Sequence, residues 1–350
     1  MDLNQHTHFH TIDPDDMYGA ILALPDQLKA GYDLGTQLPL PEMDGLRAVV
    51  IAGMGGSAIA ADMLVGCYSE ALPLPVSVIR DYRLPNWVNG DEYLVVCSSH
   101  SGNTEETLSV FAQARERGCR TVAITTGGKL SEQAAHAGLP LWQFTHTGQP
   151  RAAVGWSSGF LLALFHRLGL LADQHEAVAQ AAAAMDALIE KNSADIPTAQ
   201  NPAKRYAGQL VGKYVAVFGA EHLAPVARRW KTQINELAKS WCQYEELPEA
   251  NHNTLAGTLF PEEQLLRIFS IFLQSPHYLA RNQQRVDLTF TELMVAGIGT
   301  DKVGLRGETP FSDMWLTLLF GDLISYYLAI LLNIDPTPVE AIEAFKAQLE

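Results

Sequence analysis

The sequence predicts an α/β fold with two doubly wound domains, each a parallel sheet flanked by helices. Short apolar, β-branched runs alternate with amphipathic stretches of helical spacing, a pattern typical of parallel sheets covered on both faces. The chain has 350 residues and is 47% hydrophobic, which is enough for two buried cores. The strand, glycine turn and helix expected at residues 46–64 recur at residues 213–239, which indicates a duplication.

The first half contains five expected strands. They lie at 46–53 (LRAVVIAG), 75–82 (PVSVIRDY), 92–99 (EYLVVCSS), 121–128 (TVAITTGG) and 139–144 (LPLWQF). Helical patterns separate them at 56–68 and 104–118, and the Ala-rich stretch 157–192 predicts two more helices. Residues 196–204 carry two prolines and mark the expected crossing between halves. We therefore expect an N-terminal domain with its extension at 1–195 and a C-terminal domain with terminal helices at 196–350.

The second half restarts the pattern. Further strands are expected at 241–247 (WCQYEEL), 265–273 (LLRIFSIFL) and 286–295 (VDLTFTELMV). Residues 312–334 are apolar on most sides, which predicts a buried helix. Residues 335–349 open with Asp and two prolines, as helix starts do.

Charge and composition exclude several classes of protein. Lys and Arg number 24 against 39 for Asp and Glu, so the net charge is −15 and general binding of nucleic acid or anionic membrane is disfavoured. The N-terminus is polar and acidic, unlike a signal peptide, and no uninterrupted apolar run reaches about 18 residues. We expect a soluble, cytoplasmic protein. The four cysteines show no metal spacing, and the alternating histidines of HTHFH (6–10) lack a carboxylate or thiol framework, so we expect no metal.

The loop GMGGSA (53–58) follows the first strand and opens a helix. Glycines there let backbone amides approach a ligand, and a helix N-terminus favours an anion. The spacing also fits a dinucleotide fingerprint, but the nearest strand-end acid, Asp81, lies later than that motif requires. An anion site, a dinucleotide site and a plain tight turn all remain open for this loop.

The loop SSHSGNTEETL (98–108) carries an excess of hydroxyl groups. Thr104 stands where a helix N-cap belongs, and capping accounts for one hydroxyl. It does not account for Ser99 and Ser101. Three hydroxyls at a helix N-terminus make a compact cradle for a phosphate without a Lys or a metal. Both loops follow strands of one parallel sheet, so they should face one crevice.

These two loops resemble the sugar isomerase (SIS) domain, which binds phosphosugars. Three further motifs extend the resemblance: QPRAAVGW (149–156), INELAKSWCQYEELPEANHN (234–253) and the terminal DPTPVEAIEAFKAQL (335–349). In order, and over nearly the whole chain, the five motifs are similar to those of the bifunctional phosphoglucose/phosphomannose isomerases of bacteria and archaea. ELPEANHN is the most specific of them.

The resemblance implies two SIS domains, a homodimer, and a cofactor-free and metal-free reaction. That reaction interconverts glucose 6-phosphate or mannose 6-phosphate with fructose 6-phosphate through a cis-enediol. The implied catalytic groups are the base Glu236, together with Arg151, His252 and Lys346. In this family the histidine usually reaches the site from the partner subunit. The implied contacts to the hexose 6-phosphate are Ser99, Ser101 and Thr104 for the phosphate, with Gly56 and Ser57 close to the sugar.

Each implied role has a simpler alternative. Glu236 has Lys239 three residues on, so a solvated ion pair on a helix would also explain it. His252 lies between two Asn residues and could be a turn histidine bonded to backbone. Arg151 could pair with a surface carboxylate, and Lys346 stands on a terminal helix where a lysine is usually solvated.

Other functions stay open beside the isomerase. A sugar-phosphate sensor of the same fold would share the two loops but would not need the catalytic groups. A dinucleotide-dependent dehydrogenase would need only the glycine loop. Two residues depart from the family pattern, His100 in the hydroxyl loop and Trp156 at the end of QPRAAVGW. These departures bear on the relative rates with different sugars rather than on the type of reaction.

Overall fold

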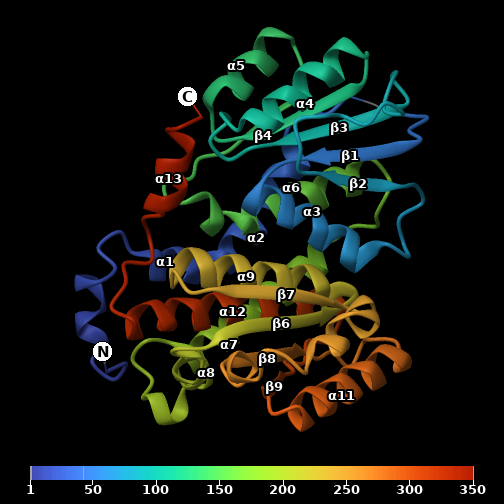
Figure 1. Cartoon of the computed structure of the whole chain (residues 1–350). Coiled ribbons are helices and arrows are strands. Elements are labelled where there is room, and N and C mark those ends of the chain that lie inside the picture. The colour runs from blue at the N-terminus through green and yellow to red at the C-terminus, as the bar shows by residue number, and fades with distance from the viewer. Residues whose placement is uncertain (1, 42, 350) are drawn as a thin grey trace. The chain divides into compact units, whose positions relative to one another are not determined.

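The computed structural model describes residues 2–41 and 43–349, which form two compact units (Figure 1). Unit 2 is Ala23–Ala183, and unit 1 is the chain from Ala184 onward together with the N-terminal residues up to Leu22. The expected domains, 1–195 and 196–350, divide the chain differently. The N-terminal segment belongs with the second half, and helix α7 (His175–Asn192) runs from one unit into the other.

Unit 2 contains the five parallel strands that the sequence predicts. Their order in the sheet is β2-β1-β3-β4-β5, and all neighbours are parallel. The order reverses between β1 and β3, where ligands bind in open α/β sheets. The strands are β1 (Ala48–Ala52), β2 (Val76–Ile79), β3 (Tyr93–Ser98), β4 (Arg120–Thr125) and β5 (Leu141–Gln143).

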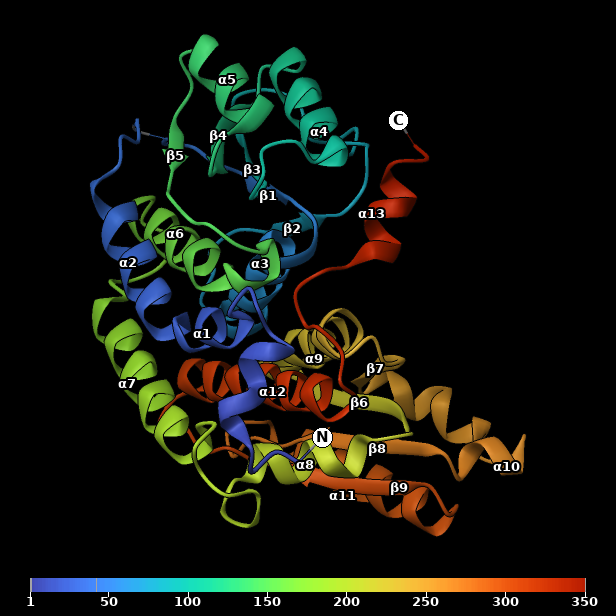
Figure 2. The ribbon, with the colours of Figure 1, turned by 90° about the vertical axis from the view of Figure 1, so that its left-hand side faces the viewer.

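Helices cover both faces of this sheet, as Figures 1 and 2 show for unit 2. Helices α4 and α5 contact β3 and β4 on one face, while α2, α3 and α6 lie together on the other. Their apolar residues bury the three central strands β1, β3 and β4 almost completely, while the edge strands β2 and β5 stay partly exposed. The helices are α2 (Leu24–Gln37), α3 (Gly55–Tyr68), α4 (Glu105–Glu116), α5 (Gly128–His136) and α6 (Val154–Arg167), with the 3-10 turn η2 (Pro150–Ala152) before α6.

Unit 1 contains a second parallel sheet with the order β7-β6-β8-β9. Its strands are β6 (Tyr214–Ala220), β7 (Cys242–Leu247), β8 (Ile268–Leu273) and β9 (Gly299–Val303). The strand expected at 286–295 was wrong, because those residues lie in α11 (Ala280–Val295). Val286, Thr289 and Leu293 are buried at helical spacing, so one face of this β-branched stretch packs as a helix.

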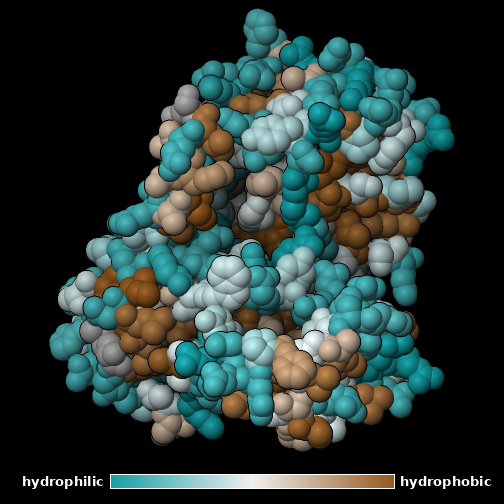
Figure 3. Space-filling model, in the orientation of Figure 1, coloured by the Kyte–Doolittle hydropathy of each residue, from teal (hydrophilic) through white to brown (hydrophobic). Residues whose placement is uncertain are grey.

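The remaining helices of unit 1 include α12, which forms the core by packing against α8 and α9, while α9 and α11 contact strands of the sheet. By length and composition α12 could cross a membrane, but 94% of its apolar window is buried inside the protein, as in the core helix of a soluble protein. On the face shown in Figure 3, hydrophobic residues form separate patches among hydrophilic ones. These helices are α1 (Met17–Leu22), α8 (Pro202–Leu210), α9 (Ala224–Leu237), α10 (Glu262–Leu265), α12 (Pro310–Leu331) and α13 (Glu340–Lys346), with the 3-10 turns η1 (His6–Thr11), η3 (Thr198–Gln200), η4 (Glu221–Leu223), η5 (Glu249–His252) and η6 (Thr254–Gly257).

The two sheets repeat one another in detail at the strand ends. Met54, after β1, has φ −126° and ψ 159°, and Ala220, at the end of β6, has φ −132° and ψ 158°. The next residues, Gly55 and Glu221, are both left-handed, with φ 51° and 47°. The backbone therefore repeats at matching places after the first strand of each motif, which supports the duplication read from the sequence.

Lys204 holds the N-terminal segment in unit 1. Its Nζ donates hydrogen bonds to the carbonyls of Leu3 (2.8 Å), Ala194 (2.6 Å) and Ile196 (2.8 Å). The ammonium also lies 5.8 Å from the Phe9 ring centre and 5.5 Å from that of Tyr327. Only 1% of the residue is exposed, and burial lowers the pKa of Lys204. One side chain thus joins the start of the chain to the segment that follows α7.

Replacing Lys204 by Met should release this segment. Three carbonyls would lose a charged donor, and hydrogen bonds of this kind contribute about 1.5–3 kcal/mol each, partly offset by hydration of the freed segment. We expect a loss of about 2–4 kcal/mol of unfolding free energy and faster proteolysis near the N-terminus. Chemical denaturation and limited proteolysis measure both. Lys191→Met, at an exposed position of α7, is the control, and equal behaviour of the two variants would contradict this role.

Candidate active site

The glycine loop lies against two other segments of unit 2. A Cβ on Gly53 would stand 2.8 Å from the Ser98 carbonyl oxygen, and one on Gly56 would stand 2.9 Å from the Pro150 carbonyl oxygen. Real Cβ atoms do not come this close to a carbonyl oxygen, so these two positions require glycine. Ser57 follows in the first turn of α3 and is buried. The three segments that the sequence singled out therefore meet at the carboxyl ends of β1 and β3.

The hydroxyl loop joins β3 to α4 and is closed by its own side chains. The hydroxyls of Ser99 and Thr104 are 2.8 Å apart and share a hydrogen bond. Ser99 Oγ also accepts from the Gly102 amide (3.1 Å), and Ser101 Oγ accepts from the Asn103 amide (3.2 Å). Thr104 is the N-cap residue of α4 as predicted, but its side chain makes no capping bond. All three hydroxyls thus turn toward the loop itself.

The main chain of this loop is anchored to β4 and α5. The Ser99 amide donates to the Ile124 carbonyl (3.0 Å), and the Thr126 amide donates to the His100 carbonyl (3.0 Å). The Leu130 amide donates to the Gly102 carbonyl (2.9 Å). Because both sides of the loop are held, its amides and hydroxyls keep their positions at the α4 N-terminus, which suits an anion.

Arg151 lies in the 3-10 turn η2, directly beside the glycine loop. Its residue is only 5% exposed, and its guanidinium donates to Gln149 Oε1 (3.2 Å). The side chain of Arg151 is therefore buried beside the glycine loop rather than exposed on the surface. The structure thus brings together, within unit 2, Gly56, Ser57, Ser99, Ser101, Thr104 and Arg151.

His100 has a partner that the sequence did not indicate. Its Nε2 lies 2.9 Å from His146 Nδ1. Burial lowers the pKa of both imidazoles, that of His100 to about 4 with a further contribution from His146. Both rings are therefore neutral near pH 7. The sequence contains His146 five residues before Arg151, but no local pattern connects this histidine to His100, so the contact could not be predicted.

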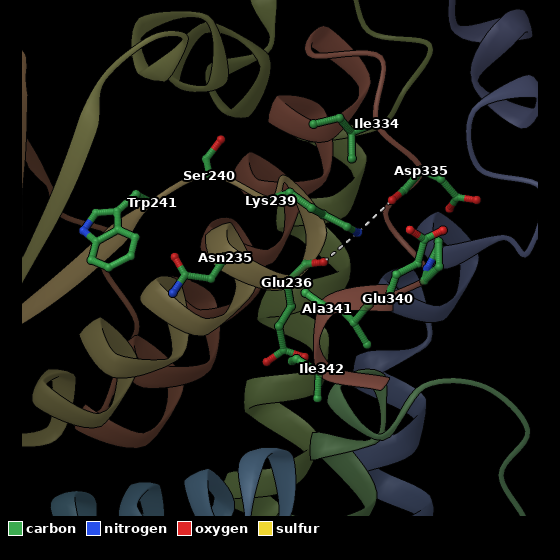
Figure 4. Close-up of a pocket in the computed structure, with 12 residues that line it drawn as sticks. Asn235, Glu236, Lys239, Ser240, Trp241, Ile334, Asp335, Glu340, Ala341 and Ile342 are labelled. Carbon is green, nitrogen blue, oxygen red and sulfur yellow. Dashed lines mark hydrogen bonds between the residues drawn. The ribbon is translucent and has the colours of Figure 1, made fainter. Parts of the chain in front are cut away.

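In unit 1, Glu236 lies in the last turn of α9 and lines a cavity of about 870 Å³ (Figure 4). The cavity lies between the end of α9 and the chain that leads into α13. Its lining residues are Asn235, Glu236, Lys239, Ser240, Trp241, Ile334, Asp335, Pro338, Val339, Glu340, Ala341 and Ile342. The implied base therefore borders a space large enough for a hexose phosphate.

Lys239 joins two segments that line this cavity by donating hydrogen bonds to main-chain carbonyls. Its Nζ donates to Glu236 O (2.8 Å), Leu237 O (3.3 Å) and Asp335 O (2.8 Å). The residue is left-handed with φ 50° and stands two residues after the last residue of the helix. The lysine thus caps the carboxyl end of α9, where a cation is favoured, and fastens the C-terminal segment to it (Figure 4).

His252 lies away from Glu236 within unit 1. Asn235 Oδ1 accepts from the Cys242 amide (2.9 Å), so Glu236 is near the start of β7, whereas His252 follows the end of that strand. A six-residue strand spans roughly 17 Å. His252 is exposed, and among the described residues its ring makes no hydrogen bond. Lys346 is the last residue of α13 and is also exposed.

Two of the three acidic residues near His252 have other partners. Glu249 Oε1 accepts from the Asn253 side chain (3.0 Å), and Glu246 lies 3.8 Å from Arg228. Glu245 lies in β7 itself. None of these observations supports an acidic group that orients the histidine.

The second sheet has a carboxylate at the place where the first offers an anion site. Glu221, the counterpart of Gly55, accepts from the Leu279 amide (2.9 Å) and from the Asn282 side chain (2.6 Å) at the start of α11. A side-chain carboxylate thus satisfies the helix N-terminus that corresponds to that of α4. In this respect the strand ends of the two sheets differ.

Comparison with known proteins extends this picture. Residues 199–349 match the model of the bacterial phospho-glucose isomerase C-terminal SIS domain. A bifunctional phosphoglucose/phosphomannose isomerase of Caldicellulosiruptor bescii is 35% identical over 335 residues, covering 95% of this chain and 98% of its own. One from Aquifex aeolicus is 34% identical over 309 residues, covering 87% and 91%.

The fold has solved relatives at lower identity. The C-terminal domain of glucosamine-fructose-6-phosphate aminotransferase from Francisella tularensis superposes with a TM-score of 0.72 at 15% identity, covering 92% of this chain and 98% of that one. Such a likeness speaks for the fold, two SIS-type α/β sheets in tandem. On the strength of the sequence relatives, the chain belongs to the family of bifunctional phosphoglucose/phosphomannose isomerases.

Proposed function

We propose that this protein is an aldose–ketose isomerase that interconverts glucose 6-phosphate and mannose 6-phosphate with fructose 6-phosphate. The proposal rests above all on the hydroxyl loop of unit 2, in a chain 35% identical to an isomerase of that name. The reaction passes through a cis-enediol. In this proposal the named side chains carry it out without a metal or a cofactor.

The hydroxyl loop binds the substrate phosphate. In this structure Ser99 and Thr104 hydrogen-bond one another, and Ser99 and Ser101 accept hydrogen bonds from amides of the loop. A phosphate offers stronger acceptors, so the hydroxyls and amides can turn to it without moving the anchored main chain. Gly56 and Ser57 border the sugar in this proposal, because both stand at the start of α3, beside the Arg151 turn.

Glu236 transfers the proton. As a carboxylate it removes the proton from C2 of the open-chain aldose, the C1 carbonyl becomes an enediolate, and the same group returns the proton to C1. The C2 hydroxyl loses its proton as the new carbonyl forms, and the C1 oxygen gains one. The reverse path begins at C1. Arg151 supplies the fixed positive charge that stabilises the enediolate oxygen.

His252 and Lys346 serve ring opening, which needs a proton donor at the ring oxygen and a base at the C1 hydroxyl. An imidazole can give and take protons near neutral pH. Since β7 separates Glu236 from His252 in one chain, a site that uses both takes its histidine from a second copy. We therefore propose a homodimer whose active sites lie near the subunit interface.

A cytoplasmic enzyme with this activity would act in glycolysis and gluconeogenesis. The acidic surface agrees with this setting, in that nucleic acid and anionic membrane are disfavoured partners for a net charge of −15. Glucose 6-phosphate and mannose 6-phosphate differ in configuration at C2, so the site must also tolerate rotation about the C2–C3 bond.

The test is a coupled assay of the purified protein on glucose 6-phosphate and on mannose 6-phosphate, with and without a chelator. We expect turnover of both, unchanged by the chelator. Binding of hexose 6-phosphate without turnover would instead favour a sugar-phosphate sensor, and tight NADH binding would favour a dehydrogenase. Loss of activity only with chelator would show a metal requirement.

Ser101→Ala should raise KM for both sugars, because one phosphate donor is lost.

A further inference from the structure

Two histidines form a neutral bridge inside unit 2. His100 stands between the two phosphate-loop serines, and His146 lies in the connector after β5 (residues 145–149). The nitrogens are 2.9 Å apart. Since burial keeps both rings uncharged near pH 7, one ring donates and the other accepts a single hydrogen bond.

Aromatic rings support this bridge from one side. The His100 ring stands edge-on to Phe144, with centres 6.0 Å apart, and at 84° to the His146 ring. Phe144 in turn stacks on Trp156 of α6, with centres 5.4 Å apart and planes 25° apart. The imidazole of His100 is thereby held in one orientation, so its Nε2 stays directed at His146.

The two ends of the bridge differ in how firmly they are held. The phosphate loop has its own main-chain bonds to β4 and α5, through Ser99, His100 and Gly102. The connector has few such bonds and includes Gly148 with φ 122°. Among the described residues, the His146 ring makes the hydrogen bond that joins residues 145–148 to the rest of unit 2.

The connector ends at the Arg151 turn. Gln149 accepts hydrogen bonds both from the Ala152 amide (2.9 Å) and from the Arg151 guanidinium (3.2 Å). Only two residues separate His146 from Gln149, so a shift of the connector carries into this turn.

We infer that the His100–His146 hydrogen bond positions Arg151 relative to the bound phosphate. The pair acts through the connector and does not touch the reacting atoms, so both are positioning residues. This inference rests on the proposed isomerase function. The hydrogen bond between the two histidines would then set the distance between the substrate's phosphate and the Arg151 guanidinium, which stabilises the enediolate.

The bridge should therefore affect catalysis more than phosphate binding. The loop keeps its other anchors when the bridge is lost, whereas Arg151 loses part of its support. One neutral hydrogen bond corresponds to roughly a three- to tenfold change in rate.

The experiment compares two variants of the full-length protein. Asn places a polar atom where His146 has Nδ1, so His146→Asn can keep the bridge, while His146→Leu fills similar space without a hydrogen bond. Kinetics with fructose 6-phosphate give kcat and KM, and calorimetry gives the Kd of inorganic phosphate. We expect His146→Leu to lose roughly three- to tenfold in kcat with a phosphate Kd within about twofold of wild type, and His146→Asn to match wild type within about twofold in both.

Three results would overturn the inference. These are a wild-type kcat in His146→Leu, a His146→Asn variant as slow as His146→Leu, or a phosphate Kd that rises in step with the loss of kcat. If His146→Leu does not fold, His100→Leu and His100→Gln provide the same comparison from the other end, because Gln can present a polar atom near Nε2. Inactive wild-type protein would contradict the proposed function itself, whereas active wild type with indifferent variants would contradict only this inference.

Discussion

Replacing Glu236 by Gln should lower kcat by about a hundred- to ten-thousandfold, the range typical for loss of a general base. The amide keeps the size of the side chain but cannot take the C2 proton. Binding of inorganic phosphate should stay as in wild type, because the hydroxyl loop belongs to the other unit. Steady-state kinetics on both sugar phosphates and calorimetry with phosphate measure the two quantities.

Glu340→Gln is the matched control for this substitution. Glu340 lines the same cavity in the first turn of α13, so the control changes the charge of the cavity equally and leaves the proposed base in place. A Glu236→Gln variant with the kcat of wild type would remove Glu236 from the mechanism. Equal losses in both variants would point to a general effect of cavity charge rather than to proton transfer.

Replacing Arg229 by Met should destabilise unit 1 by about 3–5 kcal/mol, the usual cost of leaving one partner of a buried ion pair alone. Arg229 of α9 and Asp322 of α12 are both buried and joined by two hydrogen bonds, Nε to Oδ1 (3.1 Å) and Nη2 to Oδ2 (2.8 Å). Without the guanidinium, Asp322 must stay charged in the core or take up a proton. Urea denaturation of the folded variant and of wild type gives the difference.

The loss should grow with pH. Burial already raises the pKa of Asp322, and Arg229 opposes this rise. In Arg229→Met the folded state therefore binds a proton that the unfolded state releases above about pH 4, so stability falls as pH increases from 5 to 8. The double variant Arg229→Met/Asp322→Leu should recover most of the stability and lose this pH dependence.

An exposed ion pair provides the comparison. Arg47 and Glu92 are 2.7 Å apart, but their side chains are 67% and 42% exposed. Arg47→Met should change stability by less than about 1 kcal/mol. If Arg229→Met costs no more than Arg47→Met, the pair between α9 and α12 is not what orders the helix that carries Glu236.

Most strands could be predicted because their signal is local. Runs such as YLVVCS (β3) are apolar, β-branched and bounded by turn residues, so burial on both faces is visible in the letters. The exception is instructive. VDLTFTELMV has strand-like composition but lies in α11, while the true edge strand β9 is GTDKV, half-exposed and nearly without apolar residues. β9 is a strand because it pairs with β8, and the composition of β9 alone holds no information about that pairing.

Some residues of the candidate site could also be found from the sequence, and others only from the structure. The residues of the two loops and Arg151 carry recognisable motifs, and the fold places them together. His146 and the carbonyl bonds of Lys239 carry no motif, since each is a contact between segments far apart in the chain. For Lys239 the sequence suggested an ion pair with the Glu236 side chain three residues earlier. The structure shows hydrogen bonds from Lys239 to main-chain carbonyls, one in the last turn of α9 and one at Asp335, where the C-terminal segment begins.

The sequence by itself determined the α/β class, the duplication, the two loops and the family, because strand burial, helix periodicity and glycine turns are properties of short segments. Only the tertiary structure decided which hydroxyls bind one another, that the N-terminal segment belongs with the second half, and that Glu221 fills the helix N-terminus of the second sheet. Each of these depends on segments brought together by burial of the two cores, and the energy of such long-range contacts is not a property of any local stretch. SSHSGNTEETL therefore predicts a phosphate site from its residues alone, and the folded chain adds the His100–His146 bridge beside it.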